Sequence, residues 1–157
     1  MELAGALFSA VENPYQILKI AAREFFQAAK KLETTDRQGA INSWIGAASC
    51  RLDLGKTLLA KRKYISSQKN LELAKRLFDR TEQFDLAQKS ILLALCAEFN
   101  LDPNSAVSKL AMSLKFGKFE KEMREHISPE NVELILHERD IAIMQLELQA
   151  EALSLAT

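Results

Sequence analysis

The chain has 157 residues, a length that argues for a single domain with one core. Hydrophobic residues make up 48% and charged residues 27%, which excludes a disordered chain, and the low counts of glycine (5) and proline (3) favour long helices. Lysine and arginine (21) balance aspartate and glutamate (21), so a globally basic nucleic-acid-binding protein is not expected.

The first half of the chain is predicted to form a helical hairpin over residues 13–54. Its first helix begins at Asn13-Pro14, because asparagine is a good N-cap and proline suits the first helical position. Its second helix begins near Asp36 and ends at Gly55, a residue type that commonly follows a helix C-terminus. Residues 2–11 could add a short helix.

A second hairpin is predicted over residues 56–100, and C-terminal helices over residues 102–155 complete the single domain, residues 1–157. The third helix runs from about Thr57 to Arg80, with an interruption at Ser66-Ser67, and the fourth runs from Thr81 to Phe99. Two further starts combine a capping residue with a proline, at residues 102–103 and 128–129. The fifth helix is expected to end near Gly117, and the sixth near Ser154.

Alanines, with one large residue in each set, recur at matched spacings in the two predicted hairpins, which indicates helices that pack closely. The first set is Ala28, Ala40, Trp44 and Ala47, and the second is Ala74, Ala87, Ile91 and Ala94.

Residues 71–94 resemble a tetratricopeptide repeat. The residues that carry the resemblance are Leu71, Ala74, Phe78, Ala87, Ile91 and Ala94. The repeat's usual glycine is Lys75 here, Pro103 comes about four residues late, and residues 55–70 look inserted. The long, irregular pairs, over roughly residues 25–100, are more similar to the soluble NSF-attachment-protein group. Within that group, residues 23–26, 47–50 and 74–78 resemble the huntingtin-associated helical-repeat proteins.

The expected fold is therefore all-α, with five to seven helices in antiparallel hairpins. Two architectures stay open: a repeat like that of the tetratricopeptide and NSF-attachment-protein groups, and an irregular helical bundle. The resemblance implies a large helical or coiled-coil protein partner in the cytosol.

The balanced total charge conceals two strongly charged segments. Residues 51–80 carry nine positive and three negative side chains, a net charge of +6, whereas residues 119–157 carry three positive and nine negative, a net charge of −6. The two segments could pack against each other within the chain. Alternatively, a basic patch could dock an acidic protein, a phosphoinositide head group or RNA. The patch consists of Lys56, Lys61, Arg62, Lys63 and Lys69.

The last predicted helix has apolar residues on more than one face, so it needs cover on more than one side. One row has a spacing of seven and consists of Leu134, Ile141 and Leu148. The opposite row consists of Ile135, Ala142, Leu146 and Leu153. Because a final helix normally lies at an edge, one of these rows is predicted to contact a partner. The alternative is a helix in the middle of a bundle, which needs no partner.

No catalytic residue, metal site or cofactor is predicted, and the chain is not expected to be an enzyme. Glu122 and His126 are four residues apart, as are Glu133 and His137, but their spacing differs from that of di-iron carboxylate bundles. Phosphate-binding glycine loops and nucleophile motifs are absent from the sequence.

Cellular location follows from three observations. Cys50 and Cys96 are too few for a disulfide scaffold and favour buried free thiols, although a single bridge between them stays open. The N-terminus has no basic region typical of a signal peptide. The longest apolar run, residues 91–97, is far shorter than the roughly 20 residues that a membrane span needs. A cytoplasmic location is expected.

These observations predict a non-enzymatic protein–protein interaction module, an adaptor or small subunit of a larger assembly. The partner is expected to be a larger helical or coiled-coil protein or a second copy of the chain. Nucleic acid is not expected, and peripheral membrane contact stays open. The alternative function is electrostatic binding of anionic lipid or RNA through the basic third helix.

Overall fold

The computed structural model describes residues 13–115 and 118–156, and the elements in this part of the chain are all helices. This confirms the all-α prediction and the expected number of helices. The predicted helix at residues 2–11 and the predicted helix end at Gly117 lie outside the described residues. The helices are α2 (Pro14–Leu32), α3 (Arg37–Ala60), α4 (Tyr64–Arg80), α5 (Phe84–Leu101), α6 (Pro103–Ser113), α7 (Glu120–Arg124) and α8 (Pro129–Ala156).

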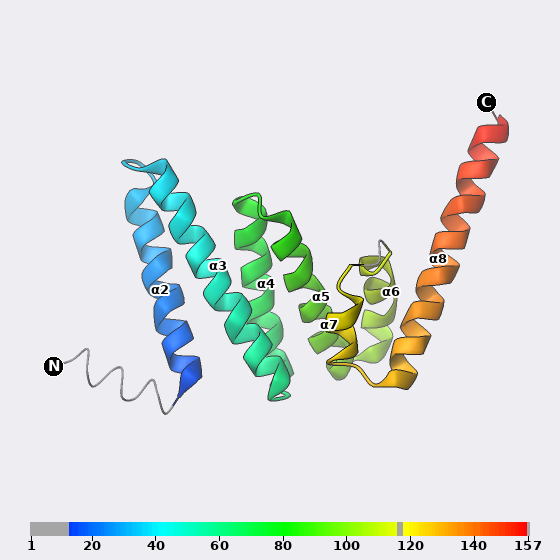
Figure 1. The fold of residues 1–157 in the computed structure, drawn as a ribbon, viewed down its shortest axis with the longest axis horizontal. Helices are drawn as coiled ribbons and strands as arrows, with labels where there is room; N and C mark the ends of the chain where they lie inside the picture. The colour runs from blue at the N-terminus through cyan, green and yellow to red at the C-terminus, as the bar shows by residue number, and fades with distance from the viewer. Residues whose placement is uncertain (1–12, 116–117, 157) are drawn as a thin grey trace.

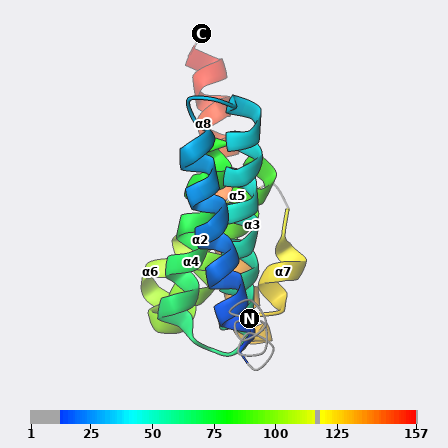
Figure 2. The same cartoon turned by 90° about the vertical axis from the view of Figure 1, so that its left-hand side faces the viewer.

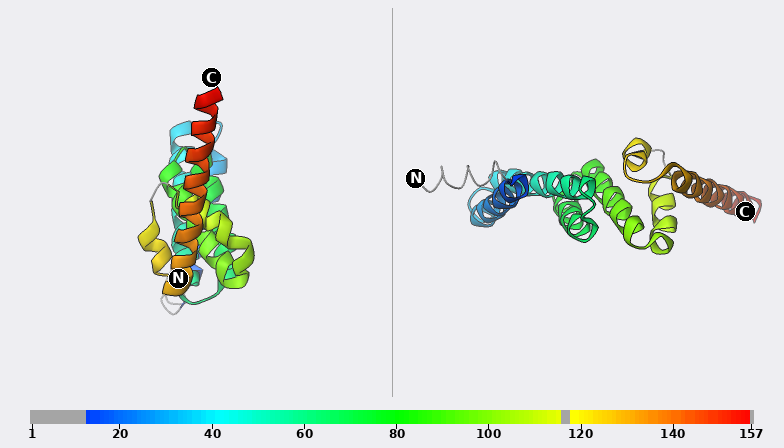
Figure 3. Two further views of the ribbon diagram at one scale, coloured as in Figure 1. Left: turned by 90° about the vertical axis from the view of Figure 1, so that its right-hand side faces the viewer. Right: turned by 90° about the horizontal axis from the view of Figure 1, so that it is seen from below.

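The helices form an elongated, up-and-down array in which each packs mainly on its sequence neighbours (Figure 1). Helices α2 to α6 contact one another in order, and α8 then packs against α6. The short α7 and α6 lie on opposite sides of the row, as the end-on views show (Figures 2 and 3). Helix α2 therefore lies at one end of the array and α8 at the other (Figure 1).

Proline and acidic residues set most helix starts, as predicted. Pro14 and Pro103 both occupy the first helical turn. Asp36 caps α3, because its carboxylate accepts a hydrogen bond from the backbone N–H of Gly39 at 3.0 Å. The side chains of Asn13 and Asp102 make no such bond, so the predicted side-chain caps are absent there and proline marks the starts of α2 and α6.

The turns on either side of α4 share one backbone geometry. Arg62 and Glu82 each adopt a left-handed conformation with a φ of 60°. The N–H of the residue after each donates to the carbonyl oxygen five residues earlier, at 2.9 Å and 2.8 Å respectively. Both turns are therefore Schellman-type helix ends, which reverse the chain within three residues.

The predicted helix end at Gly55 is wrong, because α3 continues through this glycine to Ala60. A Cβ atom at Gly55 would lie 2.5 Å from Cγ of Leu71 on α4. The hydroxyl of Ser67 donates to the Gly55 carbonyl oxygen at 2.7 Å. The missing side chain thus allows α3 and α4 to approach closely, which is a different use of glycine from a helix cap.

The boundary of the third predicted helix also differs from the prediction. The turn between the two helices lies at residues 61–63, so α4 begins at Tyr64. The predicted interruption at Ser66-Ser67 is also wrong, because both serines lie in the first turn of α4. The third predicted helix therefore divides between the end of α3 and the whole of α4.

The core is a strip that follows the interfaces between successive helices. Phe26 packs edge-on against buried Trp44, with ring centroids 4.8 Å apart, and the guanidinium of Arg80 lies 4.9 Å from the Trp44 ring. Most of the small residues with matched spacings are buried at these interfaces: Ala40, Ala47, Ala74, Ala87 and Ala94. The fully buried large side chains include Leu54, Leu71, Phe78, Leu92, Leu93, Leu110, Leu114, Met123, Val132 and Ile135.

Candidate interaction surfaces

Helix α8 is much longer than the helix against which it packs. It has 28 residues, whereas α6 has 11. At about 1.5 Å per residue the helices measure roughly 42 Å and 16 Å. Only Val132 and Ile135 of α8 are buried, and every residue from 144 to 156 is exposed. The second half of α8 therefore stands clear of the array (Figures 1 and 3).

The outer face of α8, opposite the buried Val132 and Ile135, carries an apolar row. Residues seven apart fall almost in line on a helix, with a drift of about 20° per repeat. We name this line the outer row; its members and their exposed fractions are Leu134 (47%), Ile141 (37%), Leu148 (59%) and Leu155 (88%). Leu155 was not among the predicted contact residues, and Met144, 61% exposed, lies beside the row.

An acidic row runs beside the outer row. Glu133, Asp140 and Glu147 each precede a member of the outer row by one residue, and Glu151 continues the acidic row one turn further. Residues 140–156 contain no lysine or arginine. The free part of α8 therefore combines an apolar face with an acidic edge.

The opposite predicted row begins inside the protein's own core. Ile135 is fully buried, so it is not available to a partner. Ala142 is half-buried, whereas Leu146 is 38% and Leu153 is 70% exposed. This row thus packs within the array at its start and extends onto the exposed part of α8 at its end.

Both end helices of the array expose apolar side chains. Helix α2 buries Ala22 and Ala29 and exposes Ile17, Ile20, Phe25 and Phe26 by 38–41%. Helix α8 exposes the longer apolar line, the outer row. The alternative in which α8 lies in the middle of a bundle is therefore wrong, because it is an edge helix with an apolar outer surface.

The residues of the predicted basic patch are all exposed, but the structure separates them. Lys63 and Lys69 line a hollow of about 290 Å³ between α2, α3 and α4. Arg62 lines a different hollow, of about 460 Å³, together with Glu125 and His126. Lys56 lies near His126, and Lys61 lines neither hollow.

Another hollow, of about 190 Å³, adjoins the 290 Å³ hollow that Lys63 and Lys69 line. Arg51 lines the smaller hollow, and its guanidinium donates at 2.9 Å to the side-chain oxygen of Asn70, which lines the 290 Å³ hollow. We call the two hollows together the basic groove. Its apolar residues on α3 are Ala47, Leu54 and Leu58, and its cations are Lys19, Arg23, Arg51, Lys63 and Lys69.

The positive charge of the basic groove is not neutralised by the groove's own residues. Among the described residues that line it there is no aspartate or glutamate. Burial and the charge of nearby Arg23 lower the pKa of Arg51. The ammonium of Lys63 lies 5.4 Å from the ring of Tyr15. Sequence reasoning missed Lys19 and Arg23, because they lie on α2, far along the chain from the predicted patch.

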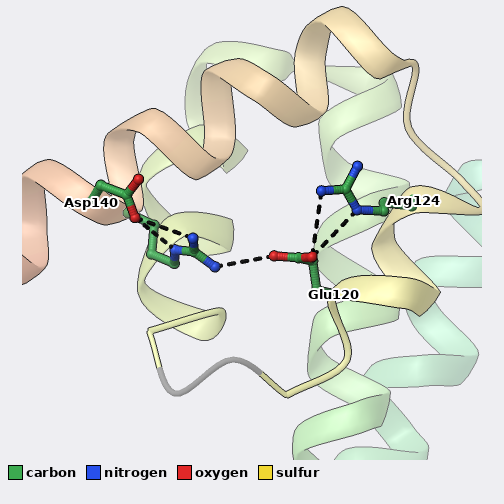
Figure 4. Close-up of polar contacts among 4 residues, drawn as sticks. Glu120, Arg124 and Asp140 are labelled. Carbon is green, nitrogen blue, oxygen red and sulfur yellow. Dashed lines mark hydrogen bonds and ion pairs between the residues drawn. The ribbon is translucent and has the colours of Figure 1, made fainter.

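Among the described residues, the basic and acidic segments meet at one point only, where Arg62 lines a hollow with Glu125 and His126 and where Lys56 lies near His126. Helix α8 contacts α6 and α7, and neither α3 nor α4 reaches it. The ion pairs near α8 are local instead: Glu120 of α7 accepts from Arg139 at 3.2 Å and from Arg124 at 3.4 Å, while Arg139 also pairs with Asp140 at 3.1 Å (Figure 4). These ion pairs join α7 to α8. They involve neither the cations of the basic groove nor Glu147 and Glu151 on the free part of α8.

The remaining candidate groups are metal ligands, the two cysteine thiols and His126. In the described ranges, no group of three or more histidine, cysteine, aspartate or glutamate side chains could hold a metal ion. Cys50 and Cys96 are free thiols, and burial raises the pKa of Cys96 to about 12. Burial lowers the pKa of His126. The charge of Glu125 acts to raise this pKa, and the charge of Lys56 acts to lower it further. No helix within residues 13–115 and 118–156 combines the length and apolarity needed to cross a bilayer.

Comparison with models of known protein families, with curated proteins and with solved structures found no match for the chain.

Proposed function

We propose that the chain is a non-enzymatic protein-interaction module, an adaptor or small subunit of a larger assembly, which docks through the outer row of α8. The observation that carries this proposal is the line of four aliphatic side chains on the face of α8 that points away from the core. Burying one such side chain fully contributes about 1.5–3 kcal/mol, so a partner that covers the row gains several kcal/mol. A helix that needed no partner would instead carry polar residues there.

The mechanism is docking of a preformed helix on a rigid support. The buried Val132 and Ile135 and the ion pair between Arg139 and Glu120 fix the first half of α8. The second half then projects as an apolar edge with an acidic border. Such an edge fits an apolar protein surface bordered by lysine or arginine, because opposite charges at the rim guide association and select the partner.

Site-specific photo-crosslinking in cells tests this proposal. A photoreactive phenylalanine analogue replaces Leu148 in the outer row, and the matched control carries it at Gln88, which is exposed on α5. Illumination is expected to give discrete crosslinked bands from position 148 and none from position 88. Equal patterns at both positions, or no band from position 148, would contradict the proposal.

The second candidate function is electrostatic binding of anionic lipid or RNA, and the uncompensated cations of the basic groove favour it. The groove is concave, however, and has an apolar base on α3, which suits a narrow ligand better than a flat membrane. Flotation with vesicles that contain phosphatidylserine, and gel shift with a single-stranded RNA oligonucleotide, are the tests. This candidate predicts binding that weakens steeply as salt rises.

A further inference from the structure

We propose that the basic groove of one copy binds the outer row of α8 from a second copy, so that the chain associates with itself head to tail. This inference rests on the proposed function, since it names the surface against which α8 docks. It concerns two different surfaces, one at each end of the array, and therefore a heterologous interface.

The groove carries positive charge, which the free part of α8, residues 140–156, lacks. Lys19 and Arg23 lie on α2, Arg51 lies on α3, and Lys63 and Lys69 lie at the start of α4. None of these five cations forms an ion pair in the part of the chain that the structure describes. Between them, the exposed apolar surface comes from Phe26 of α2, which is 38% exposed, and from half-buried Leu77 of α4, whereas Ala47, Leu54 and Leu58 at the base are buried.

The free part of α8 offers the complement. Glu147 and Glu151 form no ion pair among the described residues, and they lie next to Leu148 of the outer row. A ligand for the groove must bring carboxylates along one edge of an apolar face. The free part of α8 has that arrangement.

The two surfaces also match in length. From Ala47 to Leu58 the groove follows α3 over eleven residue steps, and the part of the acidic row from Asp140 to Glu151 also spans eleven steps. At the helical rise per residue, both measure about 16 Å. The carboxylates of Glu147 and Glu151, unpaired among the described residues and one helical turn apart, can therefore meet cations of the groove at the same time, whereas Asp140 already pairs with Arg139 at 3.1 Å.

A single copy does not bring the two surfaces together. The groove lies between α2 and α4 at one end of the array, and α8 lies at the other end (Figure 1). No contact joins α8 to α2, α3 or α4. Because each copy has one groove and one free α8, the association can continue from copy to copy in an open chain.

Sedimentation velocity of the purified full chain over a range of concentrations tests the proposal. The helix variant is Ile141→Asp/Leu148→Asp, and the groove variant is Lys63→Glu/Lys69→Glu. Wild type is expected to grow beyond a dimer as its concentration rises, and to grow less at high salt. Each variant alone is expected to lose about 100-fold or more in its association constant and to sediment as a monomer.

Mixing the two variants is the decisive step. The groove variant keeps an intact α8 and the helix variant keeps an intact groove, so an equimolar mixture is expected to form a dimer that grows no further. Circular dichroism of each variant confirms that it is folded. The charge-matched control Lys61→Glu/Arg76→Glu changes two exposed cations outside the groove, and it is expected to associate like wild type.

Three outcomes would overturn the proposal. A wild-type chain that stays monomeric at every concentration excludes self-association. Association that the groove variant leaves unchanged places the contact elsewhere. Two variants that are each monomeric and do not pair on mixing exclude a contact between the groove of one copy and α8 of another. A crosslink from position 148 to a different protein, combined with a chain that stays monomeric, would refute this inference and leave the proposed function standing.

Discussion

Replacing Gly55 by alanine tests the close approach of α3 and α4 on which the groove depends. The added Cβ would lie 2.5 Å from Cγ and 2.6 Å from Cδ2 of Leu71. Leu71 is fully buried, so its side chain cannot swing into solvent. Overpacking of this kind costs about 1–3 kcal/mol. Moving the helices apart also weakens the 2.7 Å hydrogen bond from Ser67 to the Gly55 carbonyl, at a cost of about 1 kcal/mol.

Alanine also stabilises a helix by about 1 kcal/mol relative to glycine. The net expectation for Gly55→Ala is therefore a loss of about 2 kcal/mol, measured as a lower free energy of unfolding in urea. The matched control is Gly46→Ala on the same helix, where the Cβ would meet the ring of Phe25 at 2.7 Å. That ring is 41% exposed and can turn away, so the control is expected to stay within about 1 kcal/mol of wild type. Equal or higher stability for Gly55→Ala would refute the reasoning.

Burial and charge lead to three further predictions. Leu148→Ala is expected to change the free energy of unfolding of the dilute chain by less than about 0.5 kcal/mol, because no described neighbour covers this side chain; a larger loss in urea titration would show that it packs within the chain. A thiol reagent at pH 7.5 is expected to label Cys50 in the folded protein and Cys96 only after unfolding. The reason is that Cys96 is buried and its pKa is raised to about 12. Rapid labelling of both cysteines in the folded protein would contradict this. Burial lowers the pKa of His126, so the unfolded chain binds more protons than the folded one, and stability is expected to fall as pH decreases from the usual value of 6.5 through the lowered one. Chemical denaturation of wild type and His126→Gln across this range checks it, and an identical pH dependence for the two would count against it.

The helices themselves could be predicted well from local signals. Pro14 and Asp36 mark helix starts through their own chemistry, and the spacings of Ala74 and Ala87 identify a buried face without any knowledge of the neighbours. Gly55 misled the prediction because a glycine can end a helix or admit a neighbouring one. Only the position of Leu71, on the next helix, decides between these uses.

The candidate surfaces were predictable to different degrees. The outer row of α8 is a periodic pattern within one helix, so the sequence reveals most of it, including Leu134 and Leu148. The basic groove joins Lys19 of α2 to Lys63 beside α4, and such a pairing depends on packing between distant segments. Charge counts along the chain grouped Lys63 with Arg62, yet the turn directs these neighbours into different hollows.

Amide hydrogen exchange measured peptide by peptide tests most directly whether the outer row of α8 docks on a protein surface. In the dilute purified chain, residues 144–156 are expected to exchange rapidly, because they are exposed and no described helix covers them. As protein concentration rises, exchange is expected to slow in this segment and, at the same concentrations, in peptides that contain Lys19, Arg51 and Lys69. Slow exchange of residues 144–156 in the dilute monomer would contradict the account. A rate that stays fast at every concentration, combined with no crosslink from position 148 in cells, would contradict it as well.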